Sequence, residues 1–215
     1  MKRGLIFALF LISAVPVFSQ DAVPTRTVTV RVIIDWDRRP PAPEERIRQA
    51  IEFTNKKFLK NREKFGGTIR FNIASIDVWR NMWPDQQDLD VVIAYHKDVK
   101  SIALNDKKGA DILLVYTPKG LKYQTWREID NGFEPDWDEL FGVTDFPGES
   151  DSALIHIGDW MNLTTLHELY HLFGAIDSRY LRPKEPSIMR FVEDAIADID
   201  EENAVIVRKN RTREF

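Results

Sequence analysis

The segment Asp111–Thr117, DILLVYT, constrains the fold more than any other, because five consecutive residues within it are large and apolar. A strand with water on one face alternates polar and apolar residues, whereas a continuous apolar run is typical of a strand buried on both faces. A second run, Ser152–Trp160, SALIHIGDW, predicts another buried strand. Two such strands need further layers on both faces of their sheet, which indicates an α/β domain.

The other segments alternate between strand and helix patterns. Thr27–Trp36 has period-two alternation and predicts a half-buried strand. Pro118–Asp151 is rich in Pro, Gly, Asp and Trp, and predicts mostly loop with a short edge strand within Phe141–Phe146. We further predict a helix over Glu44–Lys64, a strand over Thr68–Trp79 with a bulge between Ile73 and Ile76, a helix over Gln86–Leu104, and a last helix over Glu201–Lys209 capped by Asp200. The apolar stripe of the helix over Gln86–Leu104 is formed by Leu89, Val92, Ile93, Val99 and Ala103, and His96 lies on the same stripe. This order of elements predicts one α/β (α+β) domain with a mixed, twisted sheet of about five strands.

The first nineteen residues, MKRGLIFALFLISAVPVFS, have the pattern of a cleavable signal peptide. Lys2 and Arg3 precede an apolar run, and Val17 and Ser19 occupy the positions that a signal peptidase reads. A membrane anchor is the alternative, but the apolar run is short for a spanning helix and meets Pro16. We expect cleavage after Ser19, which leaves residues 20–215 as a secreted or periplasmic domain with no stable membrane association.

Composition narrows the classes of function and of stabilisation. The 215-residue chain has a net charge of −4 and a pI near 5.7, so it offers no basic surface for nucleic acid. The chain has no cysteine, so an exported domain must be stabilised by its core or by a bound metal. Any zinc must then be held by His and carboxylate ligands. We expect a monomer, with a solvated basic tail formed by Arg208, Lys209, Arg211 and Arg213.

The segment Thr165–Asp177, TLHELYHLFGAID, carries the residues with the most specific chemistry. His167 and His171 lie one helical turn apart on the same face, so both imidazoles can hold one ion. Glu168 is rotated from His167 by ~100° about the helix axis, where it can reach a water on the metal and act as general base. The alternative is an amphipathic helix without metal, since an apolar stripe is also present: Leu166, Leu169, Tyr170 and Phe173.

Gly174 and Asp177 extend this pattern at three-residue steps. Glycine at position 174 can adopt a positive φ and end the helix sharply. Asp177 can then return to the same metal, because a carboxylate oxygen ligates zinc at a distance similar to that of an imidazole nitrogen. The spacing therefore predicts a Zn²⁺ site formed by His167, His171 and Asp177, with one coordination position open for water.

The whole pattern resembles the signature of the metzincin clan of zinc endopeptidases, HExxHxxGxx followed by His or Asp and then by a methionine turn. Met189, within PSIMR, lies twelve residues after Asp177 and matches that turn. The aspartate ligand is similar to the snapalysin group, and the upstream element order is similar to adamalysin-type and matrixin domains. The resemblance implies hydrolysis of a protein or peptide substrate that is added as a strand along Phe141–Phe146, with Glu168 as the general base.

The sequence departs from this resemblance at several points. Phe191 stands where astacin-like and serralysin-like members have a tyrosine, and Tyr180 is more typical of a packed residue than of one facing the metal. No cysteine is available for latency through a propeptide, and seven residues separate the predicted cleavage from the first strand. Aspartate in place of the third histidine adds a negative charge near the metal, which is expected to make zinc a poorer Lewis acid.

Two other functions fit parts of the pattern. A gluzincin-type peptidase takes its third ligand from a downstream glutamate, and Glu193 lies 22 residues after His171. That alternative leaves Gly174, Asp177 and Met189 without a role. A non-catalytic, zinc-stabilised peptide-binding module is the alternative from another class, but such a module needs no general base at position 168.

Residues outside this motif support weaker expectations. His96 and His156 are each more typical of a packed histidine than of a ligand or a residue facing the substrate. The resemblance implies a substrate pocket shaped by Ser187–Asp194. The acidic segment Asp130–Asp151 either selects basic substrates or is simply solvated.

Overall fold

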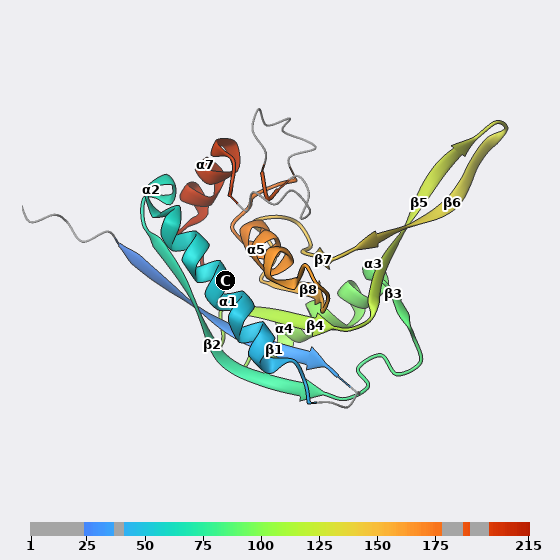
Figure 1. Cartoon of the computed structure of the whole chain (residues 1–215), viewed down its shortest axis with the longest axis horizontal. Coiled ribbons are helices and arrows are strands. Elements are labelled where there is room, and N and C mark those ends of the chain that lie inside the picture. Colours follow the sequence, from blue (N-terminus) through green and yellow to red (C-terminus); the bar gives the residue numbers. More distant parts are fainter. Residues whose placement is uncertain (1–23, 37–40, 178–186, 190–197) are drawn as a thin grey trace, which may run out of the picture.

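The computed structural model describes residues 24–36, 41–177, 187–189 and 198–215, and its centre is a five-stranded mixed sheet (Figure 1). The sheet order is β2-β1-β4-β8-β7, in which the first four strands are parallel and β7 is antiparallel to β8. The strands span Thr25–Asp35 (β1), Thr68–Trp79 (β2), Ile112–Thr117 (β4), Gly142–Val143 (β7) and Ser152–His156 (β8). The predicted α/β domain with a mixed sheet is confirmed.

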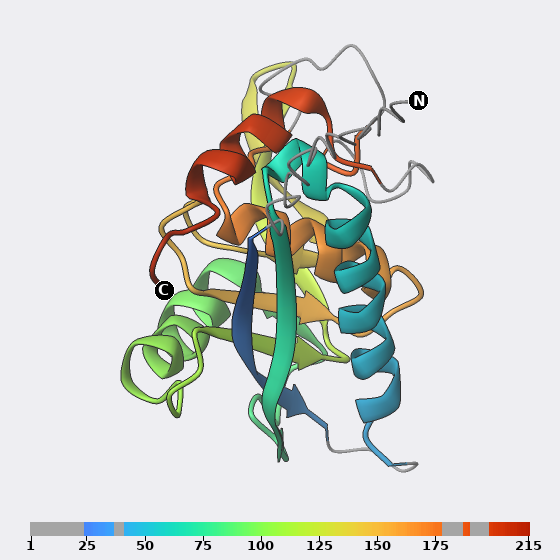
Figure 2. The ribbon, with the colours of Figure 1, turned by 90° about the vertical axis from the view of Figure 1, so that its left-hand side faces the viewer.

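Helices cover both faces of the sheet, as the buried strands required (Figure 2). On β4, Ile112, Leu114 and Tyr116 belong to one core, and Leu113 and Val115 belong to the other. The first core also receives residues of α1 (Glu44–Lys60), α2 (Arg62–Phe65), α5 (Met161–Leu172) and α7 (Glu201–Asn210). The second receives residues of the continuous segment α3 (Val91–Ala94), η1 (Tyr95–Val99, a π-helix) and α4 (Lys100–Asn105).

Two local predictions are confirmed by backbone geometry. Val30 pairs with Ile73, but the next residue of β1 pairs with Ser75, so Ala74 is the extra residue of a bulge in β2. Asp200 caps α7, because its side chain accepts a hydrogen bond from the backbone N–H of Asn203 at 2.9 Å.

Three predicted boundaries were wrong. The helix predicted over Glu44–Lys64 is broken at Asn61, where α1 ends and α2 begins. The strand predicted over Ser152–Trp160 ends at His156. The helix predicted over Gln86–Leu104 begins only at Val91, after a short strand, β3 (Asp88–Asp90), with the Asp90 side chain as its N-cap.

The segment around this helix buries only part of the apolar stripe that was predicted. Val92 and Ile93, which the periodicity placed toward the core, are exposed, and so is His96. Tyr95 is buried instead, whereas Val99 and Ala103 are buried as predicted. The π-turn of η1 inserts an extra residue into the helical repeat and offsets the buried face before it from the one after it, which a period of 3.6 does not anticipate.

Pro118–Asp151 is the largest error, because most of it forms a long hairpin and not a loop. β5 (Gly120–Ile129) and β6 (Gly132–Leu140) pair antiparallel along their whole length, and β5 joins β3 to make a second, three-stranded sheet. The hairpin projects away from the body of the molecule (Figure 1). Within the predicted edge segment Phe141–Phe146, only Gly142–Val143 is a strand, and it is the edge strand β7.

Some predictions fall outside the described residues. These include the signal peptide over residues 1–19 and the residues Tyr180, Phe191 and Glu193, and most of the segment predicted to shape the substrate pocket. No helix in the described part of the chain is long and apolar enough to cross a membrane.

Candidate metal centre

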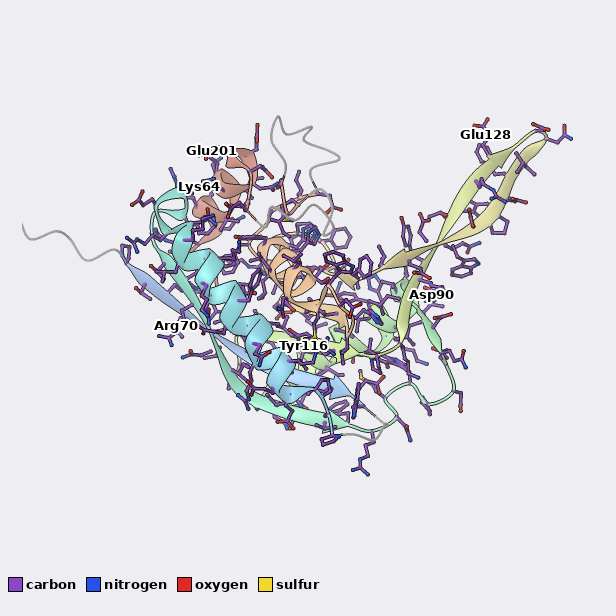
Figure 3. The ribbon with its side chains drawn as sticks, viewed as in Figure 1. Lys64, Arg70, Asp90, Tyr116, Glu128 and Glu201 are labelled. Carbon is purple, nitrogen blue, oxygen red and sulfur yellow. The ribbon has the colours of Figure 1, made fainter. Side chains whose placement is uncertain are left out.

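The motif-bearing helix α5 is fixed on the first core, between α1 and β7 (Figure 1). Tyr170 of α5 stacks on Phe58 of α1 with ring centroids 4.7 Å apart. Tyr116 of β4, labelled in Figure 3, shares a hydrogen bond of 3.1 Å with the Thr165 hydroxyl of α5. The apolar stripe predicted from the sequence is buried, so the opposite side of α5 presents its polar residues from a rigid base.

Three side chains converge at the C-terminal end of α5. The Nε2 atoms of His167 and His171 lie 3.0 Å apart, and Asp177 Oδ1 lies 3.4 Å from the first and 3.5 Å from the second. A tetrahedral zinc ion with ligands at 2.0–2.1 Å needs ligand atoms roughly 3.3 Å from one another. Within the described part of the chain, the candidate ligand atoms of these three residues lie within 4.8 Å of one another, close enough to hold one metal ion. The three residues, called the donor set below, therefore fit zinc.

Each imidazole is oriented by a backbone carbonyl on its other nitrogen. His167 Nδ1 lies 2.9 Å from the carbonyl oxygen of Ile188, and His171 Nδ1 lies 2.6 Å from that of Ala175. A carbonyl oxygen can only accept, so each Nδ1 carries the proton and donates it. Each Nε2 then holds a free lone pair directed at the shared point, which is the tautomer that a metal ligand needs.

The site favours positive charge. Burial lowers the pKa of His167, but the neighbouring Asp177 and Glu168 carboxylates outweigh it and raise that pKa above its ordinary value. Burial likewise raises the pKa of Asp177, but His167 and His171 in their protonated form, which can also donate from Nε2, hold it well below its usual range through hydrogen bonds and charge. Two carboxylates close to two imidazoles make a field that suits a divalent cation.

Gly174 turns the chain so that Asp177 meets the histidines. Its φ is +89°, and its N–H donates to the His171 carbonyl at 2.8 Å. A Cβ at this position would lie 2.5 Å from Asn210 Nδ2, so a side chain is excluded by space as well as by backbone conformation.

Glu168 stands beside this trio and not within it. It is 3% exposed, and its Oε2 accepts a hydrogen bond of 2.7 Å from the Thr144 hydroxyl. A Cβ on Gly142 of the edge strand β7 would lie 2.7 Å from Glu168 Oε1. The glutamate is therefore held between α5 and the edge strand, and its orientation depends on Thr144 and on the absence of a side chain at Gly142.

The turn around Met189 packs in the core and orients His167. Met189 is fully buried, its N–H donates to Ser187 Oγ at 3.1 Å, and Ser187 in turn donates to Asp200. The carbonyl that orients His167 belongs to Ile188 in the same turn. Met189 therefore fills the core under a turn whose backbone orients His167.

One buried amide, that of Asn203, joins this turn to the loop that carries Asp177. Asn203 Oδ1 accepts from the Ile176 N–H at 2.8 Å, and Asn203 Nδ2 donates to the Ile176 carbonyl and to Asp200, both at 3.0 Å. Ile176 directly precedes Asp177. No local pattern indicates Thr144, Asn203 or the Ile188 carbonyl, because their roles depend on contacts between distant segments.

The two remaining histidines lie outside the donor set. His156 is half-buried at the end of β8, with its Nδ1 2.9 Å from the Lys119 carbonyl oxygen. His96 lies on η1, exposed, with its ring edge-on to Tyr95.

Comparison with known proteins gives the class of fold. No protein-family model and no curated protein matches the sequence. Among solved structures, archaemetzincin from Methanopyrus kandleri matches with a TM-score of 0.54 and 14% identity, over 87% of this chain and 97% of that one. A chain in the structure of a chaperone–substrate complex matches 70% of this chain, with a TM-score of 0.45 and 13% identity. The present chain covers only 24% of that chain, and a similarity this low does not define a fold. The fold is therefore zincin-like, with a five-stranded mixed sheet and helices arranged as in archaemetzincin.

Proposed function

We propose that this chain is a zinc-dependent endopeptidase of the metzincin type, secreted or periplasmic after removal of residues 1–19. The observation that carries the proposal is the convergence of His167 Nε2, His171 Nε2 and Asp177 Oδ1, with Glu168 held next to them. The similarity to archaemetzincin supports a peptidase-type fold. A protein or peptide is the substrate, and the chain acts as a monomer.

His167, His171 and Asp177 would hold the zinc, which supplies a Lewis acid for the substrate carbonyl and for an attacking water. Glu168 accepts the proton from that water at its carboxylate and passes it to the leaving amine. Thr144 donates to Oε2 and so leaves Oε1, the oxygen near Gly142, to take the proton. A substrate strand added to the outer edge of β7 would pass beside that oxygen.

The gluzincin-type peptidase and the non-catalytic binding module both have less support than the metzincin-type peptidase. Asp177 already lies within hydrogen-bonding or ion-pair distance of both histidines, so a third ligand from Glu193 has no need to be invoked. A non-catalytic zinc-stabilised module would leave the hydrogen bond between the buried Glu168 and the half-buried Thr144 without a purpose, because neither residue belongs to the donor set.

The test is cleavage of a mixed peptide library by the purified chain, read by mass spectrometry, together with the zinc content of the same samples. We expect about one zinc per chain in the wild type and in Glu168→Ala, and a cleavage rate that falls by roughly 10²–10⁴-fold in the variant. Glu52→Ala, which removes an exposed glutamate of α1, is the matched control and should cleave as the wild type does. A zinc-loaded wild type that cleaves no peptide would favour the binding module.

A further inference from the structure

One face of the β5–β6 hairpin exposes three aromatic side chains. Trp126, Phe133 and Trp137 are 65%, 67% and 51% exposed, and we call these three residues the aromatic face. Side chains of this size are normally buried, so three on one face of a projecting element indicate a binding surface. Successive residues of a strand point to opposite faces, and the register places eight residues on this one: Lys122, Gln124, Trp126, Glu128, Phe133, Pro135, Trp137 and Glu139.

The hairpin is also strongly acidic. Between Gly120 and Leu140 it has six acidic and two basic residues, a net formal charge of −4 that equals the charge of the whole chain. Both basic residues have acidic partners: Lys122 pairs with Asp88 at 2.9 Å, and Arg127 pairs with Glu134. Glu128 and Glu139 share the aromatic face, and Glu134, Asp136 and Asp138 lie on the opposite face of the same two strands. A ligand that suits the aromatic face of this acidic hairpin therefore brings basic groups along with apolar ones. Tryptophan rings bind both kinds, through cation–π and apolar contacts.

The base of the hairpin lies next to the candidate general base. Leu121 is buried in the second core, and Leu140 packs against it. Phe141 alone separates β6 from β7, and its carbonyl accepts from the His156 N–H at 2.7 Å. From this anchored end the strands extend for nine and ten residues, a reach of roughly 30 Å. Figure 3 labels Glu128 near the outer end, far from the sheet around Tyr116.

We propose that the aromatic face binds a basic, apolar stretch of the polypeptide substrate at a distance from the bond that is cleaved. The proposal rests on the endopeptidase function, because it assigns the hairpin to the same substrate that lies along β7. A polypeptide leaving β7 toward Phe141 meets the hairpin within a few residues. Polypeptides long enough to contact both places are then preferred over short peptides.

The charge of the hairpin argues against two other occupants. A second copy of the chain would bring a second net charge of −4 to the contact, and like charges oppose such a pairing. An anionic membrane surface attracts basic segments and repels acidic ones. A basic polypeptide is the occupant for which the aromatic and the acidic side chains both contribute.

Binding is tested with the full chain carrying Glu168→Ala, so that no ligand is cleaved. The probe is a fluorescein-labelled dodecapeptide of Lys-Leu-Lys-Ser repeats, followed by fluorescence anisotropy. We expect the additional pair Trp126→Ser and Trp137→Ser to weaken binding at least about tenfold, since aromatic anchors dominate such contacts. Tyr123→Ser, which removes an aromatic residue from the opposite face of the same hairpin, is the control and should bind as the parent does. Replacing lysine by glutamate in the probe should abolish binding.

Cleavage supplies the second measurement. A peptide selected from the library is compared with the same peptide carrying the Lys-Leu-Lys-Ser extension on either side. We expect the extension to raise kcat/KM about tenfold through KM in the wild type and not in the Trp126→Ser, Trp137→Ser variant, while both cleave the short peptide equally. Equal gains in both proteins would overturn the inference and leave the endopeptidase standing. No cleavage by the wild type, with binding that still depends on the two tryptophans, would overturn the endopeptidase instead.

The variant with both Trp126→Ser and Trp137→Ser also tests whether a second copy of the chain or a membrane binds the aromatic face. Sedimentation of the wild type as a dimer that Trp126→Ser and Trp137→Ser convert to a monomer would overturn the inference in favour of a second copy. Co-sedimentation of the wild type, and not of the variant, with vesicles of phosphatidylcholine and phosphatidylserine would overturn it in favour of a membrane.

Discussion

The metal centre and the β5–β6 hairpin are neighbours in the chain but are built in opposite ways. At the centre, His167, Glu168 and His171 each have a second contact that fixes their orientation, from Ile188, Thr144 and Ala175 respectively. On the hairpin, the ion pairs and the aromatic side chains face solvent, and only the base reaches a core. Chemistry requires reacting groups held in place, whereas recognition of a long polypeptide requires exposed area.

Substitutions in the two regions should therefore have different effects. Changes beneath or within the centre should alter stability, zinc affinity or the rate with every substrate. Changes on the hairpin should alter only the preference among substrates.

The aromatic cluster beneath α5 should dominate stability. Phe58 stacks on Tyr170 and also contacts the rings of Phe65 and Phe71, with centroids 5.4 and 5.1 Å away. Phe58→Ala should lower the free energy of unfolding by about 3–5 kcal/mol, because it removes apolar contacts and leaves a cavity. Urea denaturation followed by circular dichroism measures this. Leu59→Ala, at the exposed neighbouring position, should change it little, and an equal loss there would contradict the assignment of this core.

Asp177 should account for a large share of the zinc affinity. Structural zinc sites with four ligands bind with about 10–16 kcal/mol, so one ligand contributes roughly 3 kcal/mol, or about 100-fold in Kd. Competition with a chromogenic chelator should show this loss for Asp177→Ala. Asp136→Ala on the hairpin should bind zinc as the wild type does. Loss of affinity in Glu193→Ala and not in Asp177→Ala would reverse the choice of third ligand.

Thr144 should affect the rate without affecting the metal. Its hydroxyl orients the Glu168 carboxylate and does not touch the donor set. Thr144→Val should lower kcat about tenfold, the lower end of the effect of residues that orient site groups, with KM and zinc content unchanged. Thr144→Ser keeps the hydroxyl and should recover most of the rate. A parallel loss of zinc would show that the threonine supports the site as a whole.

The sequence predicted the centre better than the hairpin for a physical reason. His167, Glu168 and His171 are placed by one helix, and Gly174 and Asp177 follow within six residues, so local geometry sets most of the arrangement. Asn203 and Thr144 reach the site only through the folded chain, which no local pattern encodes. The strands of the sheet were predictable because burial on one or both faces leaves a periodic or continuous apolar pattern.

The hairpin is mostly exposed and has no continuous apolar run. Its aromatic residues alternate with charged ones, which is a weak period-two signal, but we interpreted their mixture with Pro and Gly as loop. The sequence Asp130-Asn131-Gly132 was the usable signal, because Asn-Gly and Asp-Gly are frequent at tight hairpin turns. Flanking segments of equal length on either side of it would have completed the prediction.

Substituting the aromatic face should therefore leave the stability of the chain nearly unchanged. Trp126→Ser and Trp137→Ser remove rings that are already mostly in water, so the free energy of unfolding should shift by no more than about 0.5 kcal/mol. The same urea experiment used for Phe58→Ala measures this on the same scale. A loss of more than about 2 kcal/mol would mean that these rings pack against the body of the folded protein. The hairpin would then be a structural element, and the contrast between the two regions would fail. A negligible shift combined with weaker binding of the basic peptide would assign the tryptophans to recognition alone.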